Sequence, residues 1–237
     1  MTKRIVVGVL LAVIASAITA SVVVVVGQGR RTLDVEKVPA NKAVEEFTPY
    51  ALPGTPVAGL PLPVDYGRFH FVAPEMDPGP PAPFPTPLPG VNNVRHDVKE
   101  SATLDEFRGH DLFVDPPYIP AGWELTEAHA ETIFWDDGTS WDSSFGLYYT
   151  RPEYFSITIN RLLIAPEGKI RLVANPETKV TYTLGDIRSV PVVYNEDPLQ
   201  IQFVQGNVLT GIEAPLLHLD QLIKIADGLI AQAQEGS

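Results

Sequence analysis

Apolar and polar residues alternate in short runs along the second half of the chain. In residues 155–161 and 181–184 every second side chain is apolar, which is the period of a strand with one buried face. Turn pairs such as Asp137-Gly138 and Gly206-Asn207 separate the runs. The pattern predicts strands at residues 123–130, 141–149, 155–163, 170–173, 180–184, 188–194, 199–204 and 208–210.

The short connections predict that these strands form an antiparallel meander, because a parallel crossover needs about a dozen residues or more. One amphipathic helix closes the chain, with His218 at its expected N-cap and Asp220 in its first turn. Its apolar face comprises Leu219, Leu222, Ile223, Ala226, Leu229, Ile230 and Ala233. The predicted fold class is therefore α+β, an antiparallel β-meander of about six to eight strands packed by a C-terminal amphipathic helix.

The N-terminal part has a different pattern. From Ile5 to Val26 the chain carries no charge, and these 22 residues as a helix would span about 33 Å, close to the roughly 30 Å of a bilayer core. A cleavable signal peptide ending near Ala15-Ser16-Ala17 is the alternative, but the apolar run continues beyond that site. We expect residues 1–27 to be a cytoplasmic tip and an uncleaved signal anchor of a single-pass protein in the cell membrane. The N-terminus is then cytoplasmic and the C-terminal body extracytoplasmic.

A proline-rich stretch follows a charged connector at residues 28–48. Between Pro49 and Gly90 there are 13 prolines in 42 residues, which favours polyproline II over helix or sheet. We expect residues 49–100 to be a stalk, in which residues 69–72 form either a returning strand or a local apolar kink. Pro-x-x-Pro spacing at Pro53 and Pro78 leaves partner docking as an alternative role. The folded domain is expected at residues 101–237, opening with a capping box from Thr103 to Glu106.

Composition excludes several classes of function. The 29 acidic and 17 basic residues give a net charge of −12, and no stripe of Lys or Arg is present to neutralise phosphates, so no nucleic-acid partner is expected. The chain has no cysteine, which excludes disulfides, thiolate metal sites and a thiol nucleophile. Its five histidines are scattered without metal-ligand spacing, and residues 136–142 favour a hairpin turn over a calcium loop. No cofactor and no metal are expected.

Two stretches together resemble a known family: residues 118–125, Tyr-Ile-Pro-Ala-Gly-Trp-Glu-Leu, and residues 217–229, Leu-His-Leu-Asp-Gln-Leu-Ile-Lys-Ile-Ala-Asp-Gly-Leu. They are similar to an uncharacterised bacterial extracytoplasmic domain family with a YLPEGY lead-in and an LSLEELIKIAESL helix, which is distantly similar to half-barrel lipoprotein carriers and anti-sigma sensing domains. The chain departs from this pattern at Ala121 and His218. The resemblance implies ligand or lipopeptide sensing, and it brings no catalytic residues with it.

Catalytic signatures are absent from the sequence. Neither Gly-x-Ser-x-Gly nor Ser-x-x-Lys occurs. A carboxylate-based hydrolase remains a third reading, because acids distant in sequence can meet in space. Its candidate acids are Glu131, Asp136, Asp142 and Glu153.

Aromatic residues gather between residues 123 and 155, where an open sheet lined by them would hold an acyl chain, a glycan or a peptide. We expect a membrane-anchored, non-catalytic domain that binds or senses a lipid, peptide or glycan. The alternative is a structural module that docks an envelope protein through a sheet edge or aromatic face. The predicted ligand-binding residues are Trp123, Trp135, Trp141, Tyr148 and Tyr154.

Overall fold

The structure is a computed structural model that describes residues 54–58, 60–76, 90–91, 93–152, 156–174, 182–196 and 198–235. The expected anchor at residues 1–27, the connector at 28–48 and most of the proline run at 77–89 lie outside these ranges. Within the described ranges, no helix combines the length and the apolar character that a membrane crossing requires.

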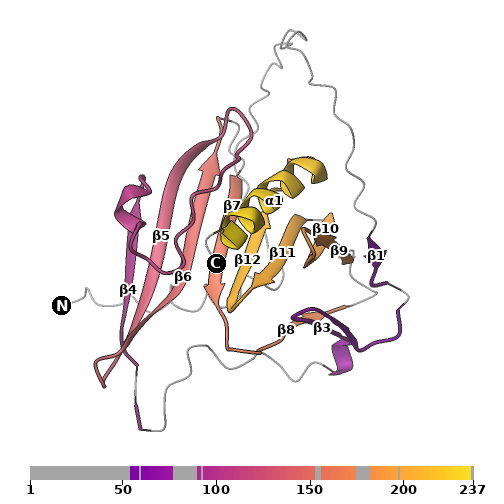
Figure 1. Cartoon of the computed structure of the whole chain (residues 1–237), viewed down its shortest axis with the longest axis horizontal. Coiled ribbons are helices and arrows are strands. Elements are labelled where there is room, and N and C mark those ends of the chain that lie inside the picture. The colour runs from indigo at the N-terminus through magenta and orange to yellow at the C-terminus, as the bar shows by residue number, and fades with distance from the viewer. Residues whose placement is uncertain are drawn as a thin grey trace, which may run out of the picture. The chain divides into compact units, whose positions relative to one another are not determined.

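Nine strands form one large antiparallel sheet in the order β1-β9-β10-β11-β12-β7-β6-β5-β4 (Figure 1). Two meanders, β4 to β7 and β9 to β12, meet where β7 pairs with β12. The strand bounds are β1 Thr55–Pro56, β4 Asn93–Ser101, β5 Glu124–Trp135, β6 Ser140–Thr150, β7 Ser156–Leu163, β9 Thr183–Ile187, β10 Val190–Glu196, β11 Leu199–Gln205 and β12 Val208–Glu213.

Three further strands form a small sheet in the order β2-β3-β8: Val64–Tyr66, Phe69–Val72 and Ile170–Val173. Strands β3 and β8 pair in parallel, so the predicted meander is interrupted at β8. A parallel pair is possible here because its two strands are about a hundred residues apart in sequence and need no short crossover. Of the two alternatives for residues 69–72, a returning strand or a local apolar kink, the structure has the strand, β3.

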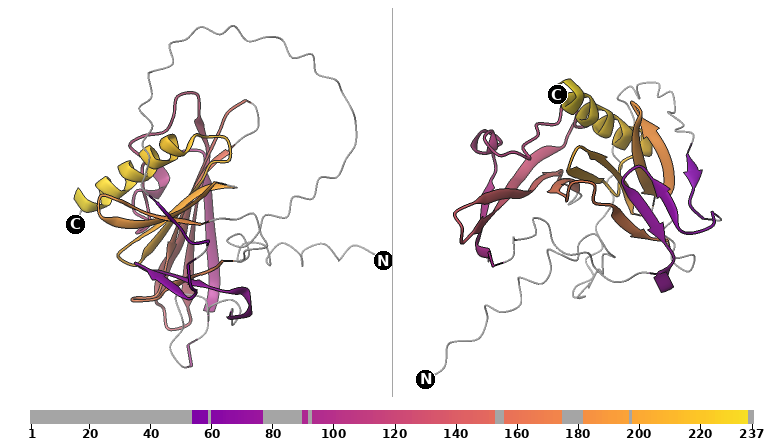
Figure 2. Two further views of the ribbon diagram at one scale, coloured as in Figure 1. Left: turned by 90° about the vertical axis from the view of Figure 1, so that its right-hand side faces the viewer. Right: turned by 60° about the horizontal axis from the view of Figure 1, so that its bottom comes forward.

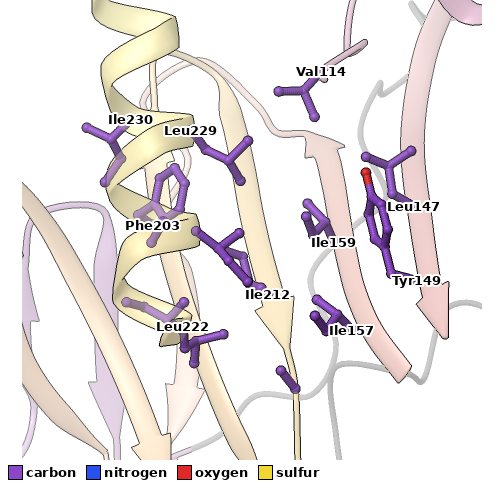
Figure 3. Close-up of a cluster of buried hydrophobic side chains, with 14 of the residues drawn as sticks. Val114, Leu147, Tyr149, Ile157, Ile159, Phe203, Ile212, Leu222, Leu229 and Ile230 are labelled. Carbon is purple, nitrogen blue, oxygen red and sulfur yellow. The ribbon is translucent and has the colours of Figure 1, made fainter. Parts of the chain in front are cut away.

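One α-helix, α1 (Leu219–Glu235), lies across one face of the large sheet (Figures 1 and 2). The predicted face is largely confirmed, since Leu222, Ile223, Ala226, Leu229 and Ile230 are buried, whereas Leu219 is half-buried. Figure 3 shows the helix side chains meeting Phe203 and Ile212 of the sheet, with Ile157 and Ile159 of β7 beside them. The N–H of His218 lies 3.4 Å from the Gln221 side-chain oxygen, which gives half of a capping box at the expected N-cap.

A second apolar cluster occupies the other face of the large sheet. There Leu184, Val193 and Leu209 pack against Phe69 and Phe71 of the small sheet. Neighbouring residues of β10, such as Val192, belong to the helix-side cluster, as the alternation of a strand requires. The strands β9 to β12 are thus covered on both faces.

The first half of the folded region differs from the expectation. Residues 54–76 were expected in the stalk, yet they hold β1, β2 and β3, and Val57 is only 3% exposed. Residues 93–100, which are also expected in the stalk, form most of β4 (Asn93–Ser101) at the edge of the large sheet. Strand β1 can hold Pro56 because it is an edge strand of the large sheet, where proline is tolerated, and strands β2, β3 and β4 contain no proline.

The predicted capping box is not formed. The segment instead makes a single 3₁₀ turn, η3 (Asp105–Phe107), without a side-chain cap. The Glu106 carboxylate accepts a hydrogen bond from Ser101 Oγ at 2.8 Å rather than reaching back to the backbone of Thr103. A second 3₁₀ turn, η2, covers Pro74–Met76.

Candidate functional site

The structure does not bring the predicted aromatic residues onto one surface. Trp123 is buried in the helix-side core, and the Arg151 guanidinium lies 5.1 Å from the centre of its ring. Tyr148 points to the opposite face of the sheet, because its neighbour Tyr149 belongs to the helix-side cluster. Trp135 is buried at the end of β5, and Trp141 is 43% exposed. Tyr154 lies outside the described residues.

A hollow of about 360 Å³ opens between β4, β5, the start of β6 and the segment around η3. Its apolar part is formed by Phe107, Ala130 and Phe134, together with Gly109. Its polar part is formed by Asp97, Lys99, Glu106, His110, Thr132 and Asp142. The hollow therefore combines an apolar floor with a larger number of charged and polar groups, whereas most small-ligand pockets are mainly apolar.

A bulge in β6 determines the position of Asp142. Strand β5 pairs Glu131 with Ser144 and then Thr132 with Asp142, so Ser143 is the extra residue. Asp142 Oδ1 accepts a hydrogen bond from Thr132 Oγ1 at 2.8 Å, and Oδ2 accepts one from the Asp111 N–H at 2.7 Å. The carboxylate thus joins the η3 segment to the sheet at the wall of the hollow.

His110 lies beside Asp142 and is almost fully buried, with a side chain 9% exposed. Its Nδ1 accepts the Leu112 N–H at 3.2 Å, which assigns the ring proton of the neutral imidazole to Nε2. Nε2 lies 3.4 Å from Asp142 Oδ1 but makes no hydrogen bond. Burial lowers the pKa of His110, so the imidazole is neutral at pH 7 and carries an unsatisfied donor into the wall of the hollow.

Both aromatic rings of the hollow carry a cation from β4. The Arg95 guanidinium lies 4.3 Å from the centre of the Phe134 ring, and the Lys99 ammonium lies 5.3 Å from that of Phe107. Lys99 also lies 3.2 Å from Glu106, whose pKa is lowered by hydrogen bonds from Ser101 and Lys99. The lining holds three carboxylates and one ammonium, so its net charge is negative at pH 7.

Of the acids expected for a hydrolase, those that the structure describes do not converge. Glu131 adjoins Thr132 in β5 and therefore points to the face opposite Asp142. Its carboxylate is held by His96 Nδ1 at 2.7 Å and Ser143 Oγ at 2.8 Å. Burial raises the pKa of Glu131, but these hydrogen bonds outweigh that effect and the pKa is lowered, which keeps the group ionised and acceptor-only. Glu153 lies outside the described residues, and Asp136 is in the hairpin turn.

The loop at residues 136–142 is the predicted hairpin turn. Asp137 accepts hydrogen bonds from the Thr139 N–H at 2.9 Å and from its hydroxyl at 2.7 Å. Gly138 has φ of 86°, a conformation that favours glycine. In the described ranges, no group of three His, Asp or Glu side chains is placed to hold a metal ion.

Two lining residues of the hollow, Asp97 and Lys99, lie in residues 93–100, which are expected in the stalk. Among residues 95–100 only Val98 is apolar, so the alternation of apolar and polar residues that is typical of a strand is missing there. Comparison with known proteins adds no identity: no family model matches the chain, and neither the curated proteins nor the solved structures contain a match.

Proposed function

We propose that the protein is a non-catalytic binding domain whose hollow receives the cationic side chain of a peptide ligand. The observation that carries the proposal is the combination of an apolar floor with the carboxylates of Asp97, Glu106 and Asp142 in one hollow. We also propose that residues 5–26 hold the domain at the outer side of a membrane, which rests on the sequence alone.

The charge of the lining favours a cation. The hollow places three carboxylates around an apolar floor, where a lysine or arginine side chain can pack its methylene groups and keep its charged end among the acids. Two cations of the chain itself, Arg95 and Lys99, already occupy the aromatic rings of this site. The cationic side chain of a ligand would displace Arg95 or Lys99 from its ring, or would share the carboxylates that these two residues contact.

A lipid or a glycan fits the same hollow less well. An acyl chain needs an enclosed apolar cavity, whereas charged groups make up much of this lining. A sugar ring stacks on an open aromatic face, and the rings of Phe107 and Phe134 are covered by Lys99 and Arg95. Of the three expected ligand classes, the peptide is therefore the one that the described hollow supports.

The test uses the full chain in detergent and two short probes, acetyl-Gly-Lys-Gly-amide and the same peptide with norleucine in place of lysine. Calorimetric titration should show binding of the lysine peptide at least about tenfold tighter than that of the norleucine peptide, since one charge contact contributes on the order of 1.4 kcal/mol. Asp142→Asn should weaken the lysine peptide by a similar factor.

Glu127→Gln is the matched control, because Glu127 lies on the same strand as Thr132 but points to the opposite face. It should leave both affinities unchanged. Equal binding of the two peptides, or equal effects of the two substitutions, would contradict the proposal. Circular dichroism of each variant establishes that it is folded.

A further inference from the structure

Strand β4 forms a long, exposed edge of the large sheet. It stands at the end of the strand order, and within the described part of the chain β5 is the strand that pairs with it. Residues 95–100 are all exposed, and Val98 is an exposed apolar side chain at 56%. The opposite edge, β1, has only two residues. A nine-residue edge leaves a row of backbone donors and acceptors able to pair with another strand.

Charges on an edge strand usually oppose such pairing. The charges of β4 have a different arrangement, because Asp97 and Lys99, which have opposite signs, lie one residue to either side of Val98. Two residues to either side are His96 and Glu100, an imidazole and a carboxylate. A strand of this kind is complementary to its own antiparallel copy.

We propose that β4 pairs with β4 of a second copy of this chain, antiparallel and centred on Val98, so that the two large sheets become continuous. Each Asp97 then lies opposite Lys99 of the other copy, and these directly opposed residues carry opposite charges that attract. Each His96 lies opposite Glu100, so two carboxylates do not oppose each other there. The two Val98 side chains meet at the axis and are removed from water.

Symmetry limits the alternative registers. A two-fold axis normal to the sheet keeps every side chain on its own face, so one residue must lie opposite its own copy. Centring on Asp97 or on Lys99 opposes like charges at the axis. Centring on His96 aligns Arg95 with Asp97 but opposes two imidazoles.

Two ion pairs of β4 are exposed and do not prevent this exchange, whereas the contact of His96 Nδ1 with Glu131 at 2.7 Å lies within one copy. Arg95 contacts Asp97 at 2.7 Å, but their side chains are 59% and 51% exposed. Lys99 and Glu106 are similarly exposed, at 52% and 51%. Exposed pairs of this kind contribute little stability and rearrange readily.

Disulfide trapping tests the register, since the chain has no cysteine of its own. In the proposed pair the two residues at position 98 have Cα atoms about 4.5 to 5.5 Å apart, within the range of a disulfide. Full-length Val98→Cys should therefore form a covalent dimer under mild oxidation, seen on a non-reducing gel.

His96→Cys is the matched control on the same face of the strand, because the two positions 96 would lie about 14 Å apart in this register. Cross-linking of His96→Cys but not of Val98→Cys would overturn the register, and cross-linking of neither would overturn the pairing. Equal cross-linking of both would indicate random collision and would also overturn it.

A charge exchange gives an independent readout, the mass of the full chain in detergent by light scattering. Lys99→Asp should convert the dimer to a monomer, because it places two acids opposite each other. The double variant Asp97→Lys with Lys99→Asp should restore the dimer, since the opposite charges are then exchanged. A monomeric wild-type chain, or a dimer unaffected by Lys99→Asp, would contradict the proposal.

Discussion

The His129 imidazole fills the space above the Cα of Gly146. The two residues lie opposite each other in β5 and β6, and a Cβ at position 146 would come within 2.6 Å of Nε2 of His129. On its other side, the ring lies 5.4 Å from the ring of Tyr148. Glycine is therefore required at position 146 by the approach of a neighbouring side chain and not by its backbone conformation.

Gly146→Ala should lower the free energy of unfolding by about 1 to 3 kcal/mol, because the methyl group must displace a packed ring. Denaturant unfolding followed by circular dichroism measures the change. The double variant Gly146→Ala with His129→Ala should recover most of the loss. A single variant as stable as the wild type would show that the ring moves aside freely.

Arg161 should hold the segment after η3 against the sheet. Its Nη1 donates to the carbonyls of Leu112 and Phe113 at 2.9 and 3.0 Å. Arg161→Met keeps the aliphatic contacts but leaves two carbonyls without this donor, which should cost about 2 to 4 kcal/mol. In the Arg161→Met variant, amide hydrogen exchange should accelerate more in residues 110–114 than in α1.

Arg171→Met, a substitution on β8 of the small sheet, is the comparison for Arg161→Met. It should leave exchange in residues 110–114 unchanged. If residues 110–114 exchange their amide hydrogens at the same rate in both variants, the Arg161 hydrogen bonds do not anchor this segment.

Local pattern was sufficient for the strands and the helix of the second half. Strand β8 has the predicted bounds, β7 and β11 differ from their predictions by one residue at one end, and β6 is longer by one residue at each end. Apolar and polar residues alternate regularly in these runs, and turn residues follow them. The local pattern is therefore enough to predict that they are strands. Strand β9 lies three residues later than predicted, because the alternation around Tyr182 does not define where pairing with β10 begins.

Pairing between distant segments was not predictable in this way. Strand β3 pairs in parallel with β8, and Phe71 of β3 lies opposite Leu172 of β8. Strand β4 is polar except for its two valines, and it forms through pairing with β5. The candidate hollow depends on both β4 and a β6 bulge, so its geometry follows from register, which residue type alone does not determine.

Acidification should destabilise the protein through two partly buried histidines, His110 and His129. Burial lowers the pKa of both His110 and His129 below its ordinary value near 6.5. In the unfolded chain these imidazoles bind protons as the pH falls through 6.5, whereas in the folded chain they do so only at lower pH. The unfolded state therefore binds more protons, and stability is lost as the pH falls from about 6.5 through the folded pKa values.

Unfolding free energies measured between pH 7.5 and 5 should show this decline, with about 1.4 kcal/mol for each unit of pKa lowering. The double variant His110→Gln with His129→Gln should have a flatter profile over the same range. His218→Gln at the exposed start of α1 is the control and should keep the wild-type slope. A wild-type profile without slope would contradict the burial of these two rings.

Gly228 in α1 provides a case in which helix propensity and packing oppose each other. Alanine at an interior helix position is normally favoured over glycine by about 0.5 to 1 kcal/mol. A Cβ at position 228, however, would lie 2.7 Å from Cγ of Pro117, in the segment that leads into β5. Because a proline ring moves little, Gly228→Ala should not stabilise the protein and should lower the free energy of unfolding by about 1 to 2 kcal/mol.

In a background with Pro117→Ala the same substitution should become stabilising, since only the helix propensity then distinguishes alanine from glycine. Denaturant unfolding of the four proteins measures the coupling between the two sites, and a stabilising Gly228→Ala in the presence of Pro117 would show that the helix does not rest on this proline.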